Sequence, residues 1–525
     1  MERRSGILLH PTSLPGKGGI GTIGENAYKF IDWLKDAGQT LWQILPLTPT
    51  GYGDSPYSSF STFAGNPLLI DLDMLVNDDF LDKKQIIPPE YVKNTDRVDF
   101  GAIVYWKNPL LKTAAKQFKE RATTELLGEY KTFKIANRDW LYAYASFMSI
   151  KEFYDEKARN EKAASSIWNA YWPSELALCK EEAVSQWNKT HKTEVESYCI
   201  IQFFFYRQWS ALKEYAHKNG ISIIGDIPIF VAMDSADAWS NQYLFQLDNN
   251  GKPKAVAGVP PDYFSATGQL WGNPLYDWDA MKKEHFSWWL RRIKKVNELV
   301  DFIRIDHFRG FDAYWRVPAG EKTAINGEWI KTPGKELFET IKKKLGNIPI
   351  IAEDLGVITE DVTKLREEFG LPGMKVLQFA FSSNEVTQNG FTNPFMPHMY
   401  NKNCVVYTGT HDNSTTTGYL SSLSEADLKV VCKYLEIDFK NSDKLIKNGF
   451  MCRSFIKLAL SSVADFAVIP MQDILELGDE ARMNMPSTAG GHNWQWRLTS
   501  KQLDSKKAEQ LKELSSLYGR NIKHK

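Results

Sequence analysis

The chain has no cysteine pattern that predicts a disulfide framework or a zinc site. Its 525 residues contain five cysteines and no C-x-x-C pair. An odd, unpatterned set is typical of reduced, buried thiols in a reducing compartment. The N-terminal apolar run Ile7-Leu8-Leu9 is too short for the core of a signal peptide, and no run approaches the length of a transmembrane helix. We therefore expect a cytoplasmic protein without a membrane partner.

The chain also lacks an excess of charge of either sign. Lys plus Arg number 64, as do Asp plus Glu, so no global field attracts nucleic acid. A neutral partner fits this balance better than a charged one. The sequence has no His-x-His motif or comparable ligand cluster, which disfavours a metal-dependent hydrolase. We expect no metal and no cofactor.

Aromatic residues are more abundant than core filling usually requires. They make up 13% of the chain and include 17 Trp. Most of these rings are expected to lie in the core. Sugar rings also stack their apolar faces on aromatic surfaces, so the excess is a hint of a carbohydrate ligand.

Eight short apolar runs predict buried strands, and helical patterns separate most of them. Runs of this length with intervening helices favour parallel strands covered on both faces. Eight alternations match a (β/α)8 TIM barrel of the α/β class. Between the first two runs, apolar residues at helical spacing from Ala27 to Leu34 predict a helix that ends at Gly38. The predicted strands are Gly6–Leu9, Leu41–Pro46, Ser222–Ile227, Phe302–Asp306, Pro349–Glu353, Met374–Phe379, Cys404–Thr408 and Ala464–Pro470.

The predicted strands are unevenly spaced, which predicts two large insertions in a single catalytic barrel that spans residues 1–525. Residues of about 72–200, after the second strand, carry polar helical patterns and are expected to form a mainly helical subdomain. Residues of about 231–285, after the third strand, are rich in Gly, Pro and aromatic residues. We expect them to form loops that act as a lid over the barrel mouth. About fifty residues follow the eighth strand, too few for a C-terminal β-sandwich.

Carboxylates stand at the ends of several predicted strands, where a parallel barrel keeps its catalytic groups. Asp306 ends one strand and Arg304 shares its side of that strand, because residues two apart point the same way. An Arg beside an Asp favours the ionised carboxylate, which suits a nucleophile. A structural ion pair is an equal alternative. His307 begins the loop beyond the strand.

A second carboxylate, Glu353, follows the apolar residues Ile350 to Ala352. Desolvation there is expected to raise the pKa of Glu353 and to keep a proton available near neutrality. A general acid needs such a proton to protonate a leaving glycosidic oxygen. The neighbouring Asp354 should point the other way and serve the structure.

The remaining strand ends supply His411, Asp412 and Asp226. Asp412 can hold sugar hydroxyls in the transition state or, alternatively, begin a helix as its N-cap. Asp226 can organise the site through hydrogen bonds or be a buried structural carboxylate. Three converging carboxylates with little basic surface nearby favour glycosidic chemistry over metal or phosphate chemistry.

Several segments, taken together, resemble the amylomaltases, or 4-α-glucanotransferases. The resemblance runs nearly from end to end and weakens mainly across the helical insertion. Its motifs are GYGDSPY (51–57), GDIPIF (225–230), GVPPDYFS (258–265), GQLWGNP (268–274), RIDHFRG (304–310), AEDLG (352–356), GTHDN (409–413), ARMN (481–484) and NWQWR (493–497).

The resemblance implies a retaining double displacement on α-1,4-glucans. Asp306 would be the nucleophile, Glu353 the general acid/base and Asp412 the transition-state stabiliser. The implied partners are maltooligosaccharides, α-1,4-glucans derived from starch or glycogen, and glucose as an acceptor. The lid residues Tyr263 and Trp271 would cover the acceptor side. The implied substrate contacts are Tyr57, Asp226, Tyr263, Trp271, Arg304, His307, His411 and Asn484.

Three positions depart from the commoner pattern of the family. Met233 stands where an acidic residue is frequent, Ser414 where Asp is frequent and Ser487 where Gly is frequent. None of them replaces a catalytic group that the resemblance implies. They bear on chain-length preference and loop shape.

Two other functions stay open. A hydrolase shares the first half-reaction and differs in letting water resolve the intermediate, whereas a catalytically silent barrel would only bind glycan. A lid rich in Pro and aromatic residues can exclude water, which favours transfer. The complete set of Asp306, Glu353 and Asp412 argues against a silent barrel. The resemblance therefore implies disproportionation of maltooligosaccharides through a covalent glucosyl-Asp intermediate.

Overall fold

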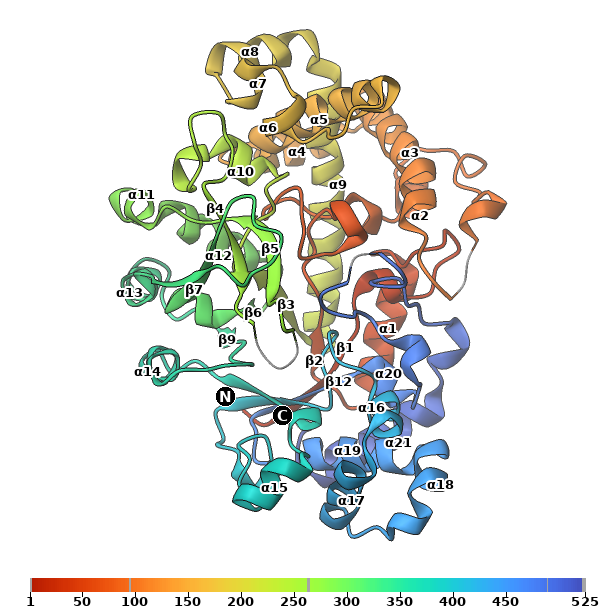
Figure 1. Ribbon diagram of the computed structural model, residues 1–525. Coiled ribbons are helices and arrows are strands. Elements are labelled where there is room, and N and C mark those ends of the chain that lie inside the picture. Colours follow the sequence, from red (N-terminus) through yellow and green to blue (C-terminus); the bar gives the residue numbers. More distant parts are fainter. Residues whose placement is uncertain (1, 94–95, 262–264, 489, 522–525) are drawn as a thin grey trace.

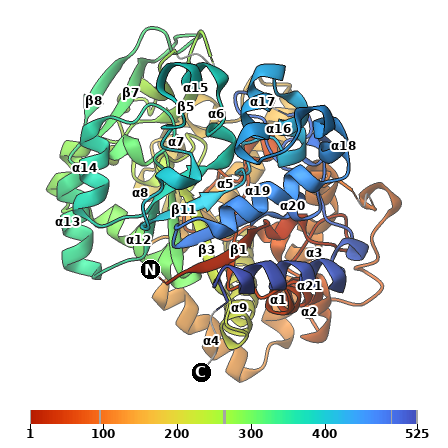
Figure 2. The same ribbon diagram turned by 90° about the horizontal axis from the view of Figure 1, so that it is seen from below.

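Eight parallel strands form a nearly closed barrel at the centre of the molecule (Figures 1 and 2). The computed structural model of the chain describes residues 2–93, 96–261, 265–488 and 490–521. Hydrogen-bonded neighbours follow the order β10-β11-β12-β1-β2-β3-β6-β9. Where β9 meets β10, the backbone N–H of Ala352 donates to the carbonyl oxygen of Pro372 (2.9 Å). The expected (β/α)8 barrel is confirmed. Its strands are β1 (Arg4–Leu8), β2 (Leu41–Gln43), β3 (Ser222–Pro228), β6 (Phe302–Asp306), β9 (Ile350–Ala352), β10 (Gly373–Val376), β11 (Cys404–Tyr407) and β12 (Phe466–Pro470).

Helices surround the barrel and extend well beyond it (Figure 1). Those between β2 and β3 are α2 (Leu72–Asn77), α3 (Phe100–Arg121), α4 (Thr124–Ala136), α5 (Leu141–Glu161), α6 (Trp168–Tyr171), α7 (Ser174–Ala177), α8 (Glu181–Thr190) and α9 (Lys192–Lys218). The others up to β10 are α1 (Glu25–Asp36), α10 (Ala236–Ser240), α11 (Trp278–Lys283), α12 (Ser287–Leu299), α13 (Gly334–Leu345) and α14 (Glu360–Glu368). The last are α15 (Ser383–Asn389), α16 (Thr416–Ser422), α17 (Glu425–Tyr434), α18 (Ser442–Lys447), α19 (Phe450–Ser461), α20 (Met471–Ile474) and α21 (Ser505–Leu517).

Helix α1 shows how the sequence pattern produces the outer layer of the barrel. Its buried residues include Ala27, Phe30, Ile31 and Leu34, which are three or four apart and therefore share one face. The helix ends at Asp36, and Gly38 follows with a φ of 65°. Gly adopts this left-handed conformation without a Cβ clash, so the predicted helix end is confirmed.

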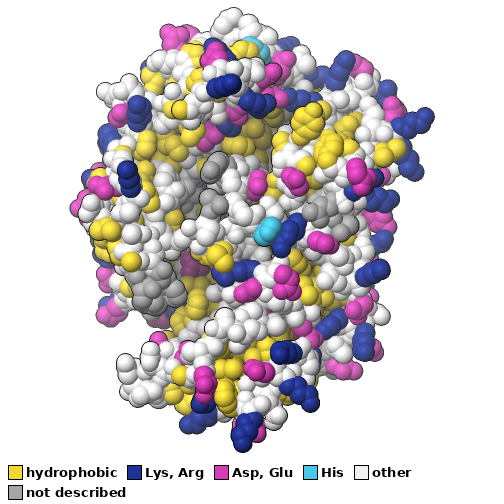
Figure 3. All heavy atoms as spheres, turned by 45° about the vertical axis from the view of Figure 1, so that its right-hand side comes forward, with side chains coloured by type: hydrophobic (Ala, Val, Ile, Leu, Met, Phe, Trp, Pro, Cys, Tyr) yellow, Lys and Arg dark blue, Asp and Glu magenta, His cyan; other side chains and the backbone are white. Residues whose placement is uncertain are grey.

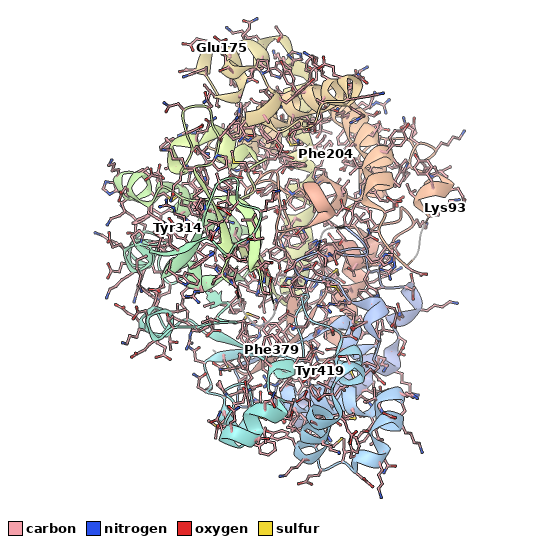
Figure 4. All side chains as sticks on the ribbon, viewed as in Figure 1. Lys93, Glu175, Phe204, Tyr314, Phe379 and Tyr419 are labelled. Carbon is pink, nitrogen blue, oxygen red and sulfur yellow. The ribbon has the colours of Figure 1, made fainter. Side chains whose placement is uncertain are left out.

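The long helix α9 joins the helical region to the barrel. Its N-terminal half packs against α3 and α5, whereas its C-terminal part contacts β3 and α1. Phe204 points from α9 towards α3 (Figure 4), and its ring lies 5.7 Å from Phe80 and 5.6 Å from Phe118. Because α9 runs without a break through residue 200, the helical region and the barrel share one continuous apolar core.

A second, smaller sheet lies beside the barrel, where the sequence predicted only loops. Its four antiparallel strands have the order β5-β4-β7-β8. Residues 231–285 contribute two of these strands as well as α10 and α11, so the prediction that this segment consists of loops is wrong. The strands are β4 (Ala255–Val259), β5 (Gln269–Pro274), β7 (Ala313–Pro318) and β8 (Glu328–Lys331). Their side chains lack the regular alternation of buried and exposed residues that reveals a strand in a sequence.

After β12 the described chain, up to residue 521, forms helices and turns and no β-sandwich, as expected. Helix α21 packs against α1 and α19. Beyond it Arg520 is fully buried and donates hydrogen bonds to backbone carbonyl oxygens of Leu460 (2.7 Å) and Arg4 (2.9 Å), among others. Of the helices in the described part of the chain, none has the length and hydropathy needed to cross a bilayer.

We expect Arg520→Ala to lower the free energy of unfolding by about 3–5 kcal/mol, because several buried carbonyl groups lose their charged donor. The midpoint of thermal unfolding measures this change. Lys506→Ala, at an exposed position of α21, the helix that precedes Arg520, is the control and should leave the midpoint nearly unchanged. Equal midpoints for both variants would contradict the prediction.

Candidate active site

The polar residues predicted at the strand ends gather at one end of the barrel. Asp226 on β3 lies beside Arg304 on β6 in the register of the two strands. The next strand in the sheet, β9, leads directly into Glu353. Parallel strands place their C-terminal ends at the same edge, so these side chains converge. The space-filling view shows that the molecule is hollowed between its upper and lower parts (Figure 3).

A buried guanidinium links two of the carboxylates. Arg304 Nη1 lies 2.6 Å from Asp226 Oδ2, and Nη2 lies 2.9 Å from Asp306 Oδ1. The Arg304 and Asp226 side chains are 3% and 0% exposed, whereas Asp306 is 31% exposed. The structure therefore contains the ion pair that the sequence suggested, and its outer carboxylate faces solvent. Such an arrangement can orient an ionised Asp306 towards a ligand.

Asp226 is the buried anchor of this cluster. Its Oδ2 also accepts a hydrogen bond from the Tyr57 hydroxyl (2.8 Å). Burial raises the pKa of Asp226 to about 6, although the charge of Arg304 opposes this effect. Asp226 is therefore ionised at neutral pH and serves to hold Arg304 and Tyr57.

Glu353 has the environment of a group that keeps its proton. Its Oε2 accepts the backbone N–H of His307 (2.7 Å), and its Oε1 accepts that of Leu355 (2.9 Å). The pKa of Glu353 is raised to about 8. Burial is the larger cause, and the negative charge of Asp306 is the second. The direction of this shift is the one predicted from the apolar residues before Glu353. The carboxyl lies beside Asp306, because the N–H that it binds belongs to the residue after Asp306.

His307 adopts an unusual backbone conformation that makes this contact possible. Its φ of 54° lies in the left-handed region, which is uncommon for residues other than Gly and costs about 1 kcal/mol or more. The conformation turns its N–H towards Glu353. Burial lowers the pKa of the His307 imidazole to about 4, so the ring is neutral at pH 7. The ring of Trp271 lies at 85° to it, with centroids 4.8 Å apart.

Asp412 is held by two neighbours. Asn484 Nδ2 donates to Asp412 Oδ1 (2.7 Å), and His411 Nε2 lies 3.4 Å from Asp412 Oδ2. The N-cap of the following helix α16 is Thr415, whose side chain accepts the N–H of Gly418. The alternative that Asp412 serves as an N-cap is therefore excluded.

Aromatic rings connect Asp412 to the cluster around Asp226. The Tyr57 ring stacks on that of His411, with centroids 5.1 Å apart and an interplanar angle of 14°. Trp494 lies beside both rings, at 5.7 and 5.9 Å. Tyr57 thus donates a hydrogen bond to Asp226 and stacks its ring on that of His411. Of the predicted substrate contacts, Tyr263 lies outside the described residues.

Asp354 does not join the site. Its Oδ1 accepts the backbone N–H of Met374 (2.7 Å), and its Oδ2 lies 3.2 Å from Arg366. These contacts tie the end of β9 to β10 and α14. The predicted structural role is confirmed.

Three residues that position the site were not singled out from the sequence. Arg482 donates to the carbonyl oxygens of Asp412 (2.7 Å) and Asn484 (2.8 Å). Arg292 on α12 is fully buried and donates to the carbonyl oxygens of Pro228 (2.5 Å) and Ile229 (3.0 Å), just after Asp226. Trp494 completes the aromatic group. Arg482 and Trp494 lie within motifs that carry the resemblance, but no spacing rule links them to the strand ends.

Comparisons with known proteins identify the family to which the chain belongs. The family model described as 4-alpha-glucanotransferase, glycoside hydrolase family 77, matches residues 9–503. The chain is 48% identical to a 4-alpha-glucanotransferase of Synechocystis sp. over 531 residues, which cover 100% of this chain and 99% of that protein. It is 46% identical to a 4-alpha-glucanotransferase of Thermus thermophilus over 520 residues, 98% of each chain.

A solved structure has the same fold. The amylomaltase from Streptococcus agalactiae in complex with acarbose superposes with a TM-score of 0.91 at 38% identity, over 99% of this chain and 100% of that one. Because the family model spans most of the chain and full-length relatives reach 48% identity, the chain belongs to the 4-alpha-glucanotransferases of glycoside hydrolase family 77 and is an enzyme with that activity on α-glucans.

Proposed function

We propose that the enzyme transfers α-1,4-glucan segments by a retaining double displacement, with Asp306 as the nucleophile and Glu353 as the acid/base. One observation carries this proposal. The half-exposed Asp306 carboxylate is fixed by buried Arg304 beside a carboxyl, Glu353, whose pKa is raised to about 8. An ionised and a protonated carboxyl side by side are what a retaining glycosidic reaction requires.

In the first half-reaction, Asp306 attacks the anomeric carbon and the bond from that carbon to the glycosidic oxygen breaks. Glu353 donates its proton to the leaving oxygen, so the shortened glucan departs with a free 4-hydroxyl. A glucosyl ester on Asp306 remains. Glu353 starts in the required protonated form at pH 7, because burial and the negative charge of Asp306 raise its pKa to about 8.

The ester also prepares the second half-reaction. Esterified Asp306 carries no negative charge, which removes one of the two causes that raise the pKa of Glu353. The pKa of Glu353 is then lower, which favours its role as the base that accepts the proton of an incoming 4-hydroxyl. The acceptor oxygen attacks the anomeric carbon, and Asp306 leaves as a carboxylate. The same pair therefore serves both steps.

Asp412 is proposed to stabilise the flattened sugar ring between these steps by accepting hydrogen bonds from two of its hydroxyls. Asn484 and His411 hold this carboxylate from both of its oxygens. Arg304, His307, Asp226 and Tyr57 are proposed to line or support the same subsite. Fixed groups of this kind lose little entropy when the transition state forms.

The hairpin of β4 and β5 is proposed to act as a lid that favours sugar over water. Trp271 on β5 lies against His307 and remains 38% exposed, so its ring can meet an acceptor sugar. The proposed acceptors are glucose and maltooligosaccharides, and the proposed donors are α-1,4-glucans from starch or glycogen. A cytoplasmic setting is proposed as well, because all five cysteines are free thiols.

Arg304→Lys should lower kcat by roughly a hundredfold or more, because one ammonium cannot bridge Asp226 and Asp306 as a forked guanidinium does. Initial rates with maltotriose measure this loss. Arg207→Lys, in a half-exposed ion pair with Asp78 on the helical region, is the matched control and should keep its rate. A kcat within about threefold of the native value for Arg304→Lys would contradict the need for a bridge.

The value of kcat/KM should fall as pH rises through about 8, because Glu353 then loses the proton that it must donate. The loss should approach tenfold for each further pH unit. A pH profile of kcat/KM for maltotriose disproportionation measures this fall. A profile that stays flat well above this pH would contradict the assignment.

The assignment of Glu353 as the acid/base can also be checked without measuring turnover. Asp306→Asn removes the negative charge beside Glu353, so the pKa of Glu353 should fall. Carbon-13 NMR titration of glutamate-labelled enzyme, with Glu353→Gln to identify the resonance, measures it. An unchanged midpoint would mean that the two carboxyls do not interact.

Maltotriose incubated with the enzyme should yield a ladder of longer maltooligosaccharides together with glucose. Chromatography of the products over time tests transfer against hydrolysis, since glucose and maltose alone would indicate a hydrolase. Asp306→Ala should lower the rate by about a thousandfold or more. Asp361→Ala, an exposed carboxylate on α14, is the control and should give the native ladder. Retained turnover in Asp306→Ala would show that another group is the nucleophile.

A further inference from the structure

A groove of about 550 Å³ lies outside the catalytic hollow, between the segment before α8 and the start of α11. Figure 1 places these two helices at the top and at the left of the molecule, away from the barrel strands. The volume falls within the roughly 300–1,000 Å³ of small-ligand sites. Its lining residues are Leu178, Lys180, Gln242, Tyr243, Phe245, Gln246, Leu247, Asp248, Asn249, Lys254 and Asp277. None of them belongs to the cluster around Asp306.

Tyr243 gives this groove an aromatic ring that is both exposed and fixed. Its side chain is 62% exposed, and its hydroxyl donates to Glu284 Oε2 (3.0 Å). Glu284 is itself held, because its Oε1 accepts the backbone N–H of Trp288 (3.1 Å). A ring that is already ordered loses little entropy when a ligand stacks on it. The apolar face of a pyranose ring is such a ligand.

The polar groups of the groove suit a neutral ligand rich in hydroxyls. Among the described residues, the side chains of Lys180, Lys254 and Asn249 have no hydrogen-bond or ion-pair partner, so their donors are available. The two Lys are balanced in charge by Asp248 and Asp277. Asp248 Oδ1 and Asp277 Oδ1 accept backbone N–H groups of their own turns. A polyanion gains little from such a balanced groove.

The floor of the groove is connected to the catalytic site by a row of aromatic rings. Phe245 lies 5.4 Å from Tyr276, which lies 5.9 Å from Phe230. Phe230 lies 6.4 Å from Trp271, whose ring meets His307. The groove is therefore near the lid sheet but separated from the scissile bond by several packed side chains. A chain bound in it can present another part of itself to the catalytic hollow only if the glucan is long.

We propose that this groove is a second glucan-binding site, which holds a short α-1,4-glucan segment against Tyr243 while another part of the same polymer reacts. The proposal rests on the activity towards α-glucans and goes beyond the reaction at Asp306. Binding at a second site raises the local concentration of the attached chain at the first. The benefit is confined to polymers, because maltotriose is too short to occupy both sites.

Tyr243→Ala and, independently, Asn249→Ala in the full-length enzyme test this proposal. Both should weaken the retardation of the enzyme in native gels that contain soluble starch, and both should raise the KM for starch about three- to tenfold with glucose as the acceptor. The value of kcat/KM for maltotriose should stay within about twofold. Tyr243→Phe keeps the ring but loses the hydrogen bond to Glu284 that orders it, so its KM for starch should lie between those of the native enzyme and Tyr243→Ala. Thermal unfolding confirms that each variant is folded.

Phe450→Ala is the matched control, because Phe450 is an exposed aromatic residue (45%) on α19, at the lower end of the molecule in Figure 1. Native starch retardation and native KM in both groove variants would overturn the proposal. An equal loss with starch and maltotriose would overturn it as well, because the ring would then act through the fold. The gel reports retardation by bound starch and not a reaction rate, so its result does not depend on which residues carry out the proposed double displacement.

Discussion

The buried guanidinium of Arg304 is the constraint on which the site depends. Its distances of 2.6 Å to Asp226 and 2.9 Å to Asp306 leave it bound between two carboxylates. Burying charges costs several kcal/mol for each ion, so this arrangement serves position more than stability. Two negative charges and one positive charge leave one negative charge in excess. Only Asp306 reaches solvent among the three, so the excess charge is directed into the hollow.

Backbone contacts between β6 and the segment that ends β9 hold the carboxyls of Asp306 and Glu353 near each other. The N–H of Glu353 donates to the carbonyl oxygen of Ile305 (3.0 Å), and the N–H of Phe308 donates to that of Glu353 (3.1 Å). The side chain of Glu353 then binds the N–H of His307. Glu353 is therefore fixed to the strand that carries Asp306 from both its backbone and its side chain. The strain at His307 is the cost of this attachment.

The parts of the fold that could be predicted from the sequence are those buried on both faces. The barrel strands are short, mostly apolar runs, and Asp306 and Glu353 were found because they stand at or directly after the end of such a run. The small sheet was missed because strands such as Gln269–Pro274 are largely exposed and show no period of two. Its pairing depends on contacts between segments far apart in the sequence.

Two buried arginines could not be identified from the sequence for a related reason. Arg292 and Arg520 are fully buried and donate to backbone carbonyl oxygens. No side chain of opposite charge marks these acceptors in the sequence, so only the folded backbone reveals them. Asp226 was found because it stands at the end of a predicted strand.

The connection between β6 and the small sheet joins the proposed lid to the strand that carries Asp306. Only the short turn Phe308–Phe311 and two flanking residues separate Asp306 from β7. Strand β7 pairs with β4, which carries the hairpin, and Asn273 on β5 donates to the carbonyl oxygen of Val231 (2.8 Å). The base of the hairpin is thus tied to the strand that carries Asp306 and to the segment that follows β3. In the proposed reaction, a lid attached in this way encloses an acceptor while Asp306 and Glu353 keep their relative positions.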